Sequence, residues 1–363
     1  MNIESLEKRL CFDAYGPTPP AGFVSQAIPL WTDSSIADQV LESKFQTYNV
    51  DGISFTEMKD VFSKSLEDGH WNRFERLQLE RYVRLGSMPE YVHYLSDAVV
   101  NGNYVSDPTD TLTEVVDKWF GGKDLPTLPE NYEYVEVEGE LYVDGLSPTD
   151  AKQGAVNDCY FITALGAISQ NAPEAIQDMI TEVETDLWVV RFYDARGDAH
   201  YVSVNDELPV RRDWTGKLTD RESVFAYFGN SNDVNNELWP ALLEKAYVQV
   251  CQNEFFRTCD NEYKDIAWGD SGIVFQNITN QEKIAVKALS KQDHIDYLNQ
   301  NKPITISYDN HTYTFESYDP ETQKFFLRNP YQRDHIIATW EELEQIPVVG
   351  AAYGGYLFDF AQI

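Results

Sequence analysis

The sequence lacks any run of apolar residues long enough to cross a membrane, which takes about 18 or more consecutive residues. We therefore expect no transmembrane segment. The first residues, MNIESLEKRL, also lack the basic head and apolar stretch of a secretory signal. A cytoplasmic location is then the default expectation, and the sequence leaves the source compartment open.

Cysteines are few as well. The four of them, Cys11, Cys159, Cys251 and Cys259, form no Cys-x-x-Cys pair and no spacing typical of metal ligands. Cys251 and Cys259 are close enough in sequence to pair, although nothing in the pattern requires it. We expect no disulfide framework and a reduced thiol at Cys159.

Basic residues are scarce relative to acidic ones: 28 Lys and Arg stand against 60 Asp and Glu, a formal net charge of −32. Such a surface repels nucleic-acid backbones and anionic lipid, so we expect neither as a partner. The charge favours solubility, or contact with cations and with basic segments of a protein partner or substrate. With 42% hydrophobic residues, the composition is that of a globular protein rather than a disordered one.

The chain of 363 residues is long enough for two or three domains. Apolar residues recur at helical spacing from about residue 36 to residue 94 and again in TLTEVVDKWF, which predicts an all-helical N-terminal domain over residues 1–125. The segment GGKDLPTLPENYEYVE is typical of a linker and places a boundary at about residues 121–133. A pro-region and a docking domain are the two roles we consider for the N-terminal domain.

Residues 130–363 have a mixed pattern that predicts an α+β fold. Helical patterns dominate up to about residue 265, interrupted by an antiparallel hairpin in LWVVRFYD and HYVSVNDELPV. A helical pattern over residues 284–300 precedes five strand-like runs, PITISYD, HTYTFESYD, KFFLRN, HIIATW and GGYLFDF. We therefore expect a helical lobe over about residues 130–265 and an antiparallel β lobe over about residues 266–363.

Cys159 lies where the polar loop DAKQGAVND turns into the apolar, helix-patterned run CYFITALGAIS. A cysteine at a helix N-terminus faces unpaired backbone N–H groups, which favour the thiolate. A catalytic thiolate also needs a base, a group that orients the base, and donors for the developing oxyanion. These requirements define which other residues to seek.

His311 fits the base, because it begins a strand of the predicted β lobe. Asn329 ends a nearby strand, fixed by Pro330, and is placed to hydrogen-bond the imidazole of His311 and orient it without adding charge. Gln153, six residues before Cys159, fits an oxyanion donor beside the backbone N–H of Cys159. Nucleophile and oxyanion donor thus belong to the helical lobe, base and orienter to the β lobe.

Several segments resemble the calpain family of cysteine proteases. QGAVNDCYFITALGAIS is similar to the family's active-site segment, which reads Gln-Gly, three residues, Asp-Cys-aromatic and an apolar helix. ELWPALLEKAYVQV is similar to the family segment with Ala-Leu-Leu-Glu-Lys-Ala-Tyr, and VSVNDELPV to a strand that ends in acidic residues and Leu-Pro. NHTYTF and RNPY stand where the family has His-Ala-Tyr and Arg-Asn-Pro-Trp. Together the segments cover about residues 135–335 in the family's order.

The resemblance implies a papain-like cysteine endopeptidase of two subdomains, a helical lobe and an antiparallel β lobe, with the substrate cleft between them. It implies the same four site residues: Cys159 as nucleophile, His311 as base, Asn329 as orienter and Gln153 as oxyanion donor. Protein or peptide substrates follow from the same resemblance. The N-terminal helical part resembles nothing that we recognise.

Some positions depart from the family pattern. Asn310 and Thr312 flank the base where the family has Gly and Ala. Tyr331 replaces the Trp after Asn-Pro, and Gln332 replaces the following Gly. Asn310 and Thr312 are bulkier than the family residues, and together with Tyr331 they are the main reason to consider a core that has lost activity.

The resemblance also implies a calcium site in the first subdomain. Asp158 and Glu237, with loop carbonyls, would bind one Ca²⁺ ion there. The acidic ligands that the family carries in the second subdomain are missing from QRDHII, so we do not expect a second site. An N-cap on the helix of Cys159 is an equally good explanation of Asp158. The chemistry itself requires no cofactor.

Two other functions remain in view. One is a catalytically silent, calpain-like module that binds proteins, which the complete set of four site residues disfavours. The other is a transglutaminase-type acyltransferase, which would use the same Cys and His with an amine acceptor. Its third member would be Asp, so Asn329 disfavours it.

Overall fold

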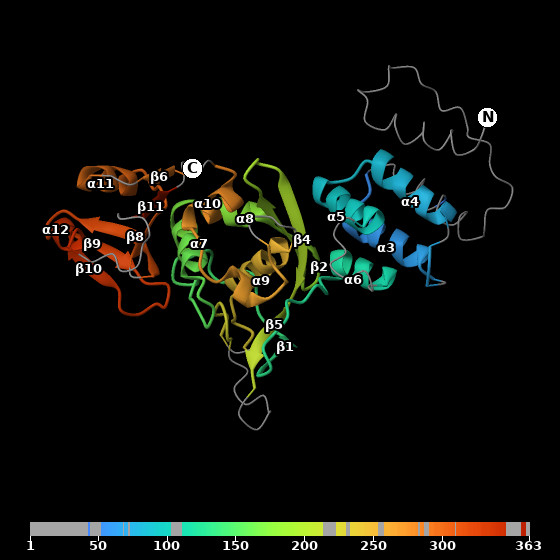
Figure 1. Cartoon of the computed structure of the whole chain (residues 1–363), viewed down its shortest axis with the longest axis horizontal. Coiled ribbons are helices and arrows are strands. Elements are labelled where there is room, and N and C mark those ends of the chain that lie inside the picture. The colour runs from blue at the N-terminus through green and yellow to red at the C-terminus, as the bar shows by residue number, and fades with distance from the viewer. Residues whose placement is uncertain are drawn as a thin grey trace, which may run out of the picture.

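The structure, a computed structural model, describes Ser43 and residues 52–67, 69–71, 73–102, 111–212, 223–229, 233–252, 258–281, 284–286, 290–308, 310–345 and 357–360. This part of the chain combines helices with antiparallel sheets, as the sequence predicts (Figure 1). The helical prediction for residues 1–42 and 44–51, and Cys11, lie outside the described residues. Across the ranges that the structure describes, no helix has both the length and the apolar character of a membrane span.

The N-terminal part is helical from Phe55 onward. It contains α3 (Phe55–Ser65), α4 (Arg73–Leu85), α5 (Glu90–Asn101) and α6 (Leu112–Gly121). Capping boxes begin α3 and α6, in which Ser54 pairs with Glu57 and Thr111 with Glu114. Each box satisfies backbone N–H groups that the first helical turn leaves without an intrahelical partner.

A three-stranded antiparallel sheet separates two hydrophobic cores. It consists of β2 (Ile180–Glu184), β3 (Leu187–Tyr193) and β4 (Ala199–Asn205), with β3 in the middle. Successive side chains of a strand point to opposite faces. On β3, Trp188 and Val190 therefore join one core, and Leu187 and Val189 join the other. Helices α3–α6 cover the second face (Figure 1), so they share their core with the sheet.

The first face of this sheet carries α8 (Pro173–Met179), α9 (Trp239–Cys251) and α10 (Ser271–Thr279), and α7 (Cys159–Asn171) packs on these three helices (Figure 1). Helix α9 is buried along its whole length and α7 along nearly all of it, as their almost continuous apolar sequences require. A separate antiparallel pair is formed by β1 (Tyr132–Glu136) and β5 (Glu207–Arg211), and the short 3₁₀ helix η2 (Tyr263–Ile266) packs on α9. The predicted strand HYVSVNDELPV is thus divided at Asp206 between two sheets.

The end of α9 carries a disulfide. Cys251 is joined to Cys259, with the two Cα atoms 5.7 Å apart. The sequence permitted this pairing without requiring it. Cys159 is a free, buried thiol, as expected.

The C-terminal half contains a six-stranded antiparallel sheet in the order β10-β9-β8-β7-β11-β6. Its strands are β6 (Ile284–Val286), β7 (Ile304–Tyr308), β8 (His311–Asp319), β9 (Lys324–Arg328), β10 (Ile336–Thr339) and β11 (Leu357–Phe360). Four of the predicted strand runs are present in it, together with the described part of the fifth, Leu357–Phe360. A third hydrophobic core includes Ile306, Phe315 and Phe325 of this sheet and side chains of α11 (Lys291–Asn299) and α12 (Trp340–Leu343).

The predicted helix over residues 284–300 is wrong in its first part. Ile284–Val286 is a strand that pairs with β11. The helix starts only at Lys291, after a capping box formed by Ser290 and Asp293. The apolar spacing of the helix continues into the strand, so the local pattern does not separate the two. The strand is fixed by its pairing with β11, which lies more than 70 residues further along the chain.

The predicted linker at residues 121–133 is a docked segment. Lys118 forms an ion pair with Asp124 (2.9 Å), and the Gln249 side chain donates to the Asp124 carbonyl (2.6 Å). Gly122 follows α6 in a left-handed conformation with φ of 63°. A Cβ added there would lie 2.9 Å from the backbone nitrogen of Asn205 on β4. This close approach fixes the N-terminal helices against the sheet.

We predict that Gly122→Ala destabilises the protein, because it puts a Cβ into β4 and forces a non-glycine residue into the left-handed region. The expected loss is about 2 kcal/mol in the free energy of unfolding, measured by urea denaturation. Gly121→Ala is the matched control, since its added Cβ meets nothing closer than 3.6 Å and alanine favours the helix. Equal urea midpoints for the two variants would contradict the close packing at Gly122.

Candidate active site

The contact between α7 and β8 brings Cys159, the predicted nucleophile, to the strand that begins with His311, the predicted base. The Thr163 hydroxyl on α7 donates to the backbone oxygen of Thr312 on β8 (3.1 Å). The Thr314 hydroxyl donates in the other direction, to the backbone oxygen of Thr163 (3.1 Å). Cys159 is the first residue of α7, and His311, the neighbour of Thr312, is the first of β8.

The Cys159 side chain is buried, with 6% of its surface exposed. Its thiol donates a hydrogen bond to the Thr312 hydroxyl, with Sγ and Oγ1 3.8 Å apart. The Thr312 hydroxyl in turn lies 2.9 Å from Ser307 Oγ. Burial raises the pKa of the Cys159 thiol above its ordinary value, and the hydrogen bond to Thr312 only partly opposes this. The helix start is where the sequence predicts it, but burial at this position favours the thiol and opposes the preference for the thiolate at a helix N-terminus.

His311 and Asn329 are joined by a hydrogen bond between Nε2 and Oδ1 of 2.9 Å. The same Asn329 oxygen accepts the backbone N–H of Tyr331 (3.0 Å). A backbone N–H can only donate, so this atom is an acceptor and the His311 Nε2 carries the hydrogen of the bond. The Nδ1 of the neutral imidazole then has a lone pair with which to accept a proton.

Two aromatic rings hold the imidazole. Tyr331 stacks parallel to His311, with ring centroids 5.2 Å apart and an interplanar angle of 7°. Tyr313 meets His311 edge-on at 4.9 Å. Burial lowers the pKa of His311, opposed by its hydrogen bond to Asn329. Tyr331, which stands where the resemblance leads us to expect Trp, covers one face of the imidazole.

Gln153 is tied to the segment that follows β9. Its backbone N–H donates to the carbonyl of Pro330 (2.9 Å), and its side-chain Nε2 donates to the carbonyl of Val156 (2.7 Å). An amide nitrogen carries two hydrogens, so the bond to Val156 uses one of them. Gln153 is therefore fixed in the loop before α7 while keeping a second N–H for a ligand.

Asp158 occupies the N-cap position of α7, but its side chain makes no capping hydrogen bond. Its carboxyl group faces that of Glu244 on α9, and both side chains are fully buried. Burial is the main cause that raises the pKa of both carboxyl groups, and the charge of Asp158 raises that of Glu244 further. Two carboxylates in such a contact do not both ionise, so the pair keeps a proton. Asp158 therefore stands at the N-cap position, as the sequence predicts, but its carboxyl group does not cap the helix.

Glu237 has different neighbours. Its carboxylate accepts the backbone N–H of Val143 (3.1 Å) and is hydrogen-bonded to Asp150. Burial raises the pKa of Glu237 to about 7 and also raises that of Asp150. No cluster of three or more His, Cys, Asp and Glu side chains suited to a metal ion occurs among the described residues. A calcium ion bound by Asp158 and Glu237 stays a prediction, and the structure adds Asp150 as the carboxyl group beside Glu237.

Sequence reasoning missed Asp150, Glu244 and the hydroxyl of Thr312 as neighbours of the site. Glu244 left a signal, because a carboxylate within the mostly apolar run PALLEKAY is buried and needs a partner. Thr312 was noted only as a bulky substitution, since its contact with Cys159 spans 153 residues of sequence. Nothing in the polar stretch around Asp150 distinguishes it from other loop acids.

Comparisons with known proteins point to one family. The model of the calpain family of cysteine proteases matches residues 129–301, which include Cys159 and end before His311. Calpain-5 of Caenorhabditis elegans is 32% identical over 119 residues, covering 30% of this chain and 16% of that protein. The calpain of Schistosoma mansoni is 28% identical over 191 residues, covering 49% and 22%. The calpain-1 catalytic subunit of Mus musculus is 27% identical over 150 residues, covering 39% and 17%.

The matched part thus spans less than a quarter of each of these relatives. The family match contains the loop and helix of Cys159, while the β-sheet that carries His311 and Asn329 is placed by the structure. From the family match, the relatives and the fold together, we conclude that this chain contains a calpain-like cysteine protease catalytic core.

Proposed function

We propose that the chain is a cysteine endopeptidase that cleaves protein substrates at a limited number of sites. Cys159 is the nucleophile, His311 the base and Asn329 the residue that orients it, and Gln153 donates to the oxyanion. The site lies between two subdomains of a papain-like core, namely the helices around α7 and the six-stranded sheet. The calpain-like core supports the peptidase class, and the assignment of the four residues is our own.

The proton can be followed through each step of this proposal. His311 Nδ1 takes the thiol proton as the Cys159 sulfur attacks the scissile carbonyl carbon. The developing oxyanion accepts hydrogen bonds from the Gln153 side chain and the Cys159 backbone N–H. The imidazolium then protonates the leaving amine as the C–N bond breaks. Water, activated by the neutral imidazole, hydrolyses the thioester and restores the thiol.

One observation carries the proposal: the hydrogen bond from His311 Nε2 to Asn329, beside a residue that touches the Cys159 sulfur. The bond fixes the tautomer in which Nδ1 is unprotonated, as a base acting on a thiol requires. A histidine with only a structural role would not need a buried free thiol at the start of the neighbouring helix.

A catalytically silent binding module is the second candidate. The observation that favours it is the resting hydrogen bond of the Cys159 thiol, which goes to Thr312 rather than to His311. A transglutaminase-type acyltransferase is less well supported, because Asn329 occupies the place of the expected Asp. Incorporation of a labelled amine without peptide cleavage would favour the acyltransferase over the peptidase.

We predict that a peptidyl epoxide adds once, and covalently, to Cys159. Intact mass spectrometry measures the addition, and Cys159→Ala should remove it entirely. Cleavage of a labelled casein should disappear in the same variant. If the wild-type protein is folded but takes up no epoxide, that result would favour the binding-module hypothesis.

Calcium enters this proposal only through Glu237 and its carboxyl neighbours. The labelling reaction is therefore run in calcium and in EDTA. If a bound calcium ion controls the site, EDTA should slow labelling of the wild type, and Glu237→Gln should make labelling slow in both buffers. Equal rates in both buffers would show that the chemistry proceeds without calcium.

We predict that alkylation of Cys159 by iodoacetamide accelerates as the pH rises, with an inflection above the ordinary thiol pKa of 9.0. The rate follows the thiolate fraction, and burial raises the pKa of Cys159. Thr312→Val removes the hydroxyl that lowers this pKa, so the rate at pH 7 should fall roughly tenfold, one pKa unit. Thr312→Ser retains the hydroxyl and is the control. An inflection well below 9.0 would indicate a preformed thiolate–imidazolium pair and contradict this prediction.

A further inference from the structure

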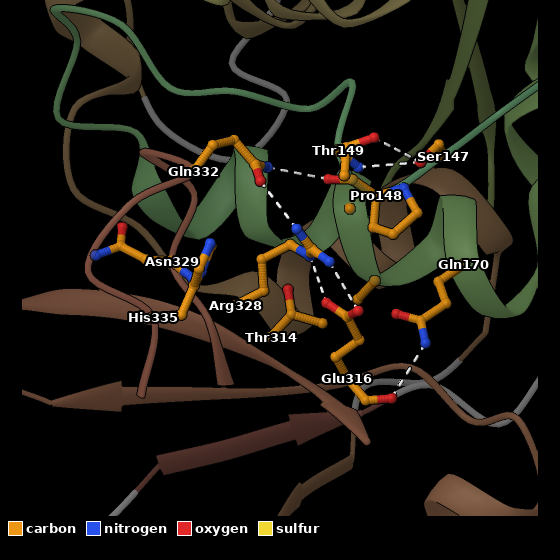
Figure 2. Close-up of polar contacts among 12 residues, drawn as sticks. Ser147, Pro148, Thr149, Gln170, Thr314, Glu316, Arg328, Asn329, Gln332 and His335 are labelled. Carbon is orange, nitrogen blue, oxygen red and sulfur yellow. Dashed lines mark hydrogen bonds and ion pairs between the residues drawn. The ribbon is translucent and has the colours of Figure 1, made fainter. Parts of the chain in front are cut away.

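Two residues of the six-stranded sheet and one of the turn between β9 and β10 hold the loop that precedes α7. We call Glu316, Arg328 and Gln332 the clasp. The side-chain nitrogen of Gln332 donates to the backbone carbonyls of Pro148 and Ala151, each at 3.1 Å. Figure 2 shows the Gln332 side chain between Arg328 and the chain at Pro148.

Every hydrogen of the Gln332 carboxamide is used by this contact. Its two N–H groups serve the two carbonyls, and its oxygen accepts from Arg328 (3.0 Å). No shorter or differently shaped side chain offers two donors and one acceptor at this reach. The contact therefore depends on the identity of the residue as well as on its size.

The backbone conformation of Gln332 also indicates a specific role for its side chain. Gln332 has a φ of 55°, in the left-handed region that costs an L-residue about 1–2 kcal/mol. Glycine would adopt this conformation without cost, and glycine is what the family pattern has at this position. The strained glutamine is held by the hydrogen bonds of its side chain and by its N–H bond to the Asn329 carbonyl (2.9 Å).

The rest of the clasp orients Gln332. Arg328 forms a two-pronged ion pair with Glu316 through Nε and a second nitrogen, the latter at 2.7 Å. Both side chains are largely shielded from water, at 14% and 22% exposure, so the fork geometry of the pair is well defined. The Gln170 side chain of α7 also donates to the Glu316 backbone oxygen (3.1 Å), which anchors the clasp to the helix (Figure 2).

The loop held by the clasp contains the proposed oxyanion donor. Ala151 lies two residues before Gln153, and the Gln153 N–H bonds to Pro330, two residues before Gln332. Two short segments, 148–153 and 329–332, are thus joined at three points. The first segment carries Gln153, and the second begins with Asn329.

We propose that Gln332 is a positioning residue: it fixes the loop before α7 so that the Gln153 amide stays aligned with the His311–Asn329 pair. This inference rests on the proposed peptidase function for its catalytic consequence. It assigns no chemical step to Gln332, which acts through Gln153.

The test uses two variants of the full chain and one control. Gln332→Glu keeps the shape and the acceptor for Arg328 but sets a carboxylate against two carbonyl oxygens. Gln332→Gly removes the side chain and relieves the left-handed strain, so it separates loss of the clasp from loss of the fold. Gln345→Glu adds the same charge at an exposed position outside the clasp.

The first measurement compares two reactions of Cys159. Cleavage of labelled casein needs the oxyanion donor, whereas alkylation by iodoacetamide is a direct displacement that forms no oxyanion. We expect both Gln332 variants to lose on the order of 10- to 100-fold in the cleavage rate. Their alkylation rates and pH profiles should stay within about twofold of the wild type, because the thiol contacts Thr312 and not the clasp.

The second measurement is amide hydrogen exchange over residues 147–157, which needs no activity. Opening of the loop should speed exchange there roughly tenfold in both Gln332 variants and leave Gln345→Glu unchanged. Unchanged exchange in the variants overturns the proposal, and so does faster exchange with full cleavage activity. A wild-type protein that cleaves nothing counts against the proposed function, and the exchange result then decides whether the clasp holds the loop.

Discussion

The site depends above all on the register of β8 against α7. Thr163 of the helix exchanges hydrogen bonds with the Thr312 backbone oxygen and the Thr314 hydroxyl, and the Thr312 hydroxyl accepts from the Cys159 thiol. A slip of one residue would break these bonds and take Thr312 away from the thiol. The two buried threonine bonds therefore fix where the strand that begins with His311 lies relative to Cys159.

Burial around the start of α7 favours neutral groups in a protein whose formal charge is −32. It raises the pKa of Cys159, lowers that of His311 and leaves Asp158 and Glu244 with a shared proton. In a buried site of this kind, a charge that exists before the substrate binds carries a desolvation cost. Under the proposed function, the proton passes from sulfur to imidazole only at the moment of attack, when Gln153 would donate to the new negative charge.

Local periodicity explains what could be predicted from the sequence. The helix of Cys159, the five strand runs and the pairing of His311 with Asn329 follow from spacing and from a strand that ends at Pro330. What could not be predicted depends on partners far along the chain. Asp158 turns from the cap position to Glu244 on α9, and the strand at Ile284–Val286 forms only because β11 returns beside it. The N-terminal helices likewise bury side chains against Leu187 and Val189, which no pattern within those helices indicates.

Three of the departures from the calpain pattern form contacts of their own around the proposed site. Thr312 replaces Ala and takes up hydrogen bonds to Cys159 and Ser307. Tyr331 replaces Trp and still stacks on the imidazole, and Gln332 replaces Gly with all three of its polar positions engaged. Thr312 thus joins the His311 strand to Cys159, and Gln332 joins the turn after β9 to the loop before α7. An unpaired polar group at either position would cost stability, so the bonds of these two side chains offset the cost of burying them.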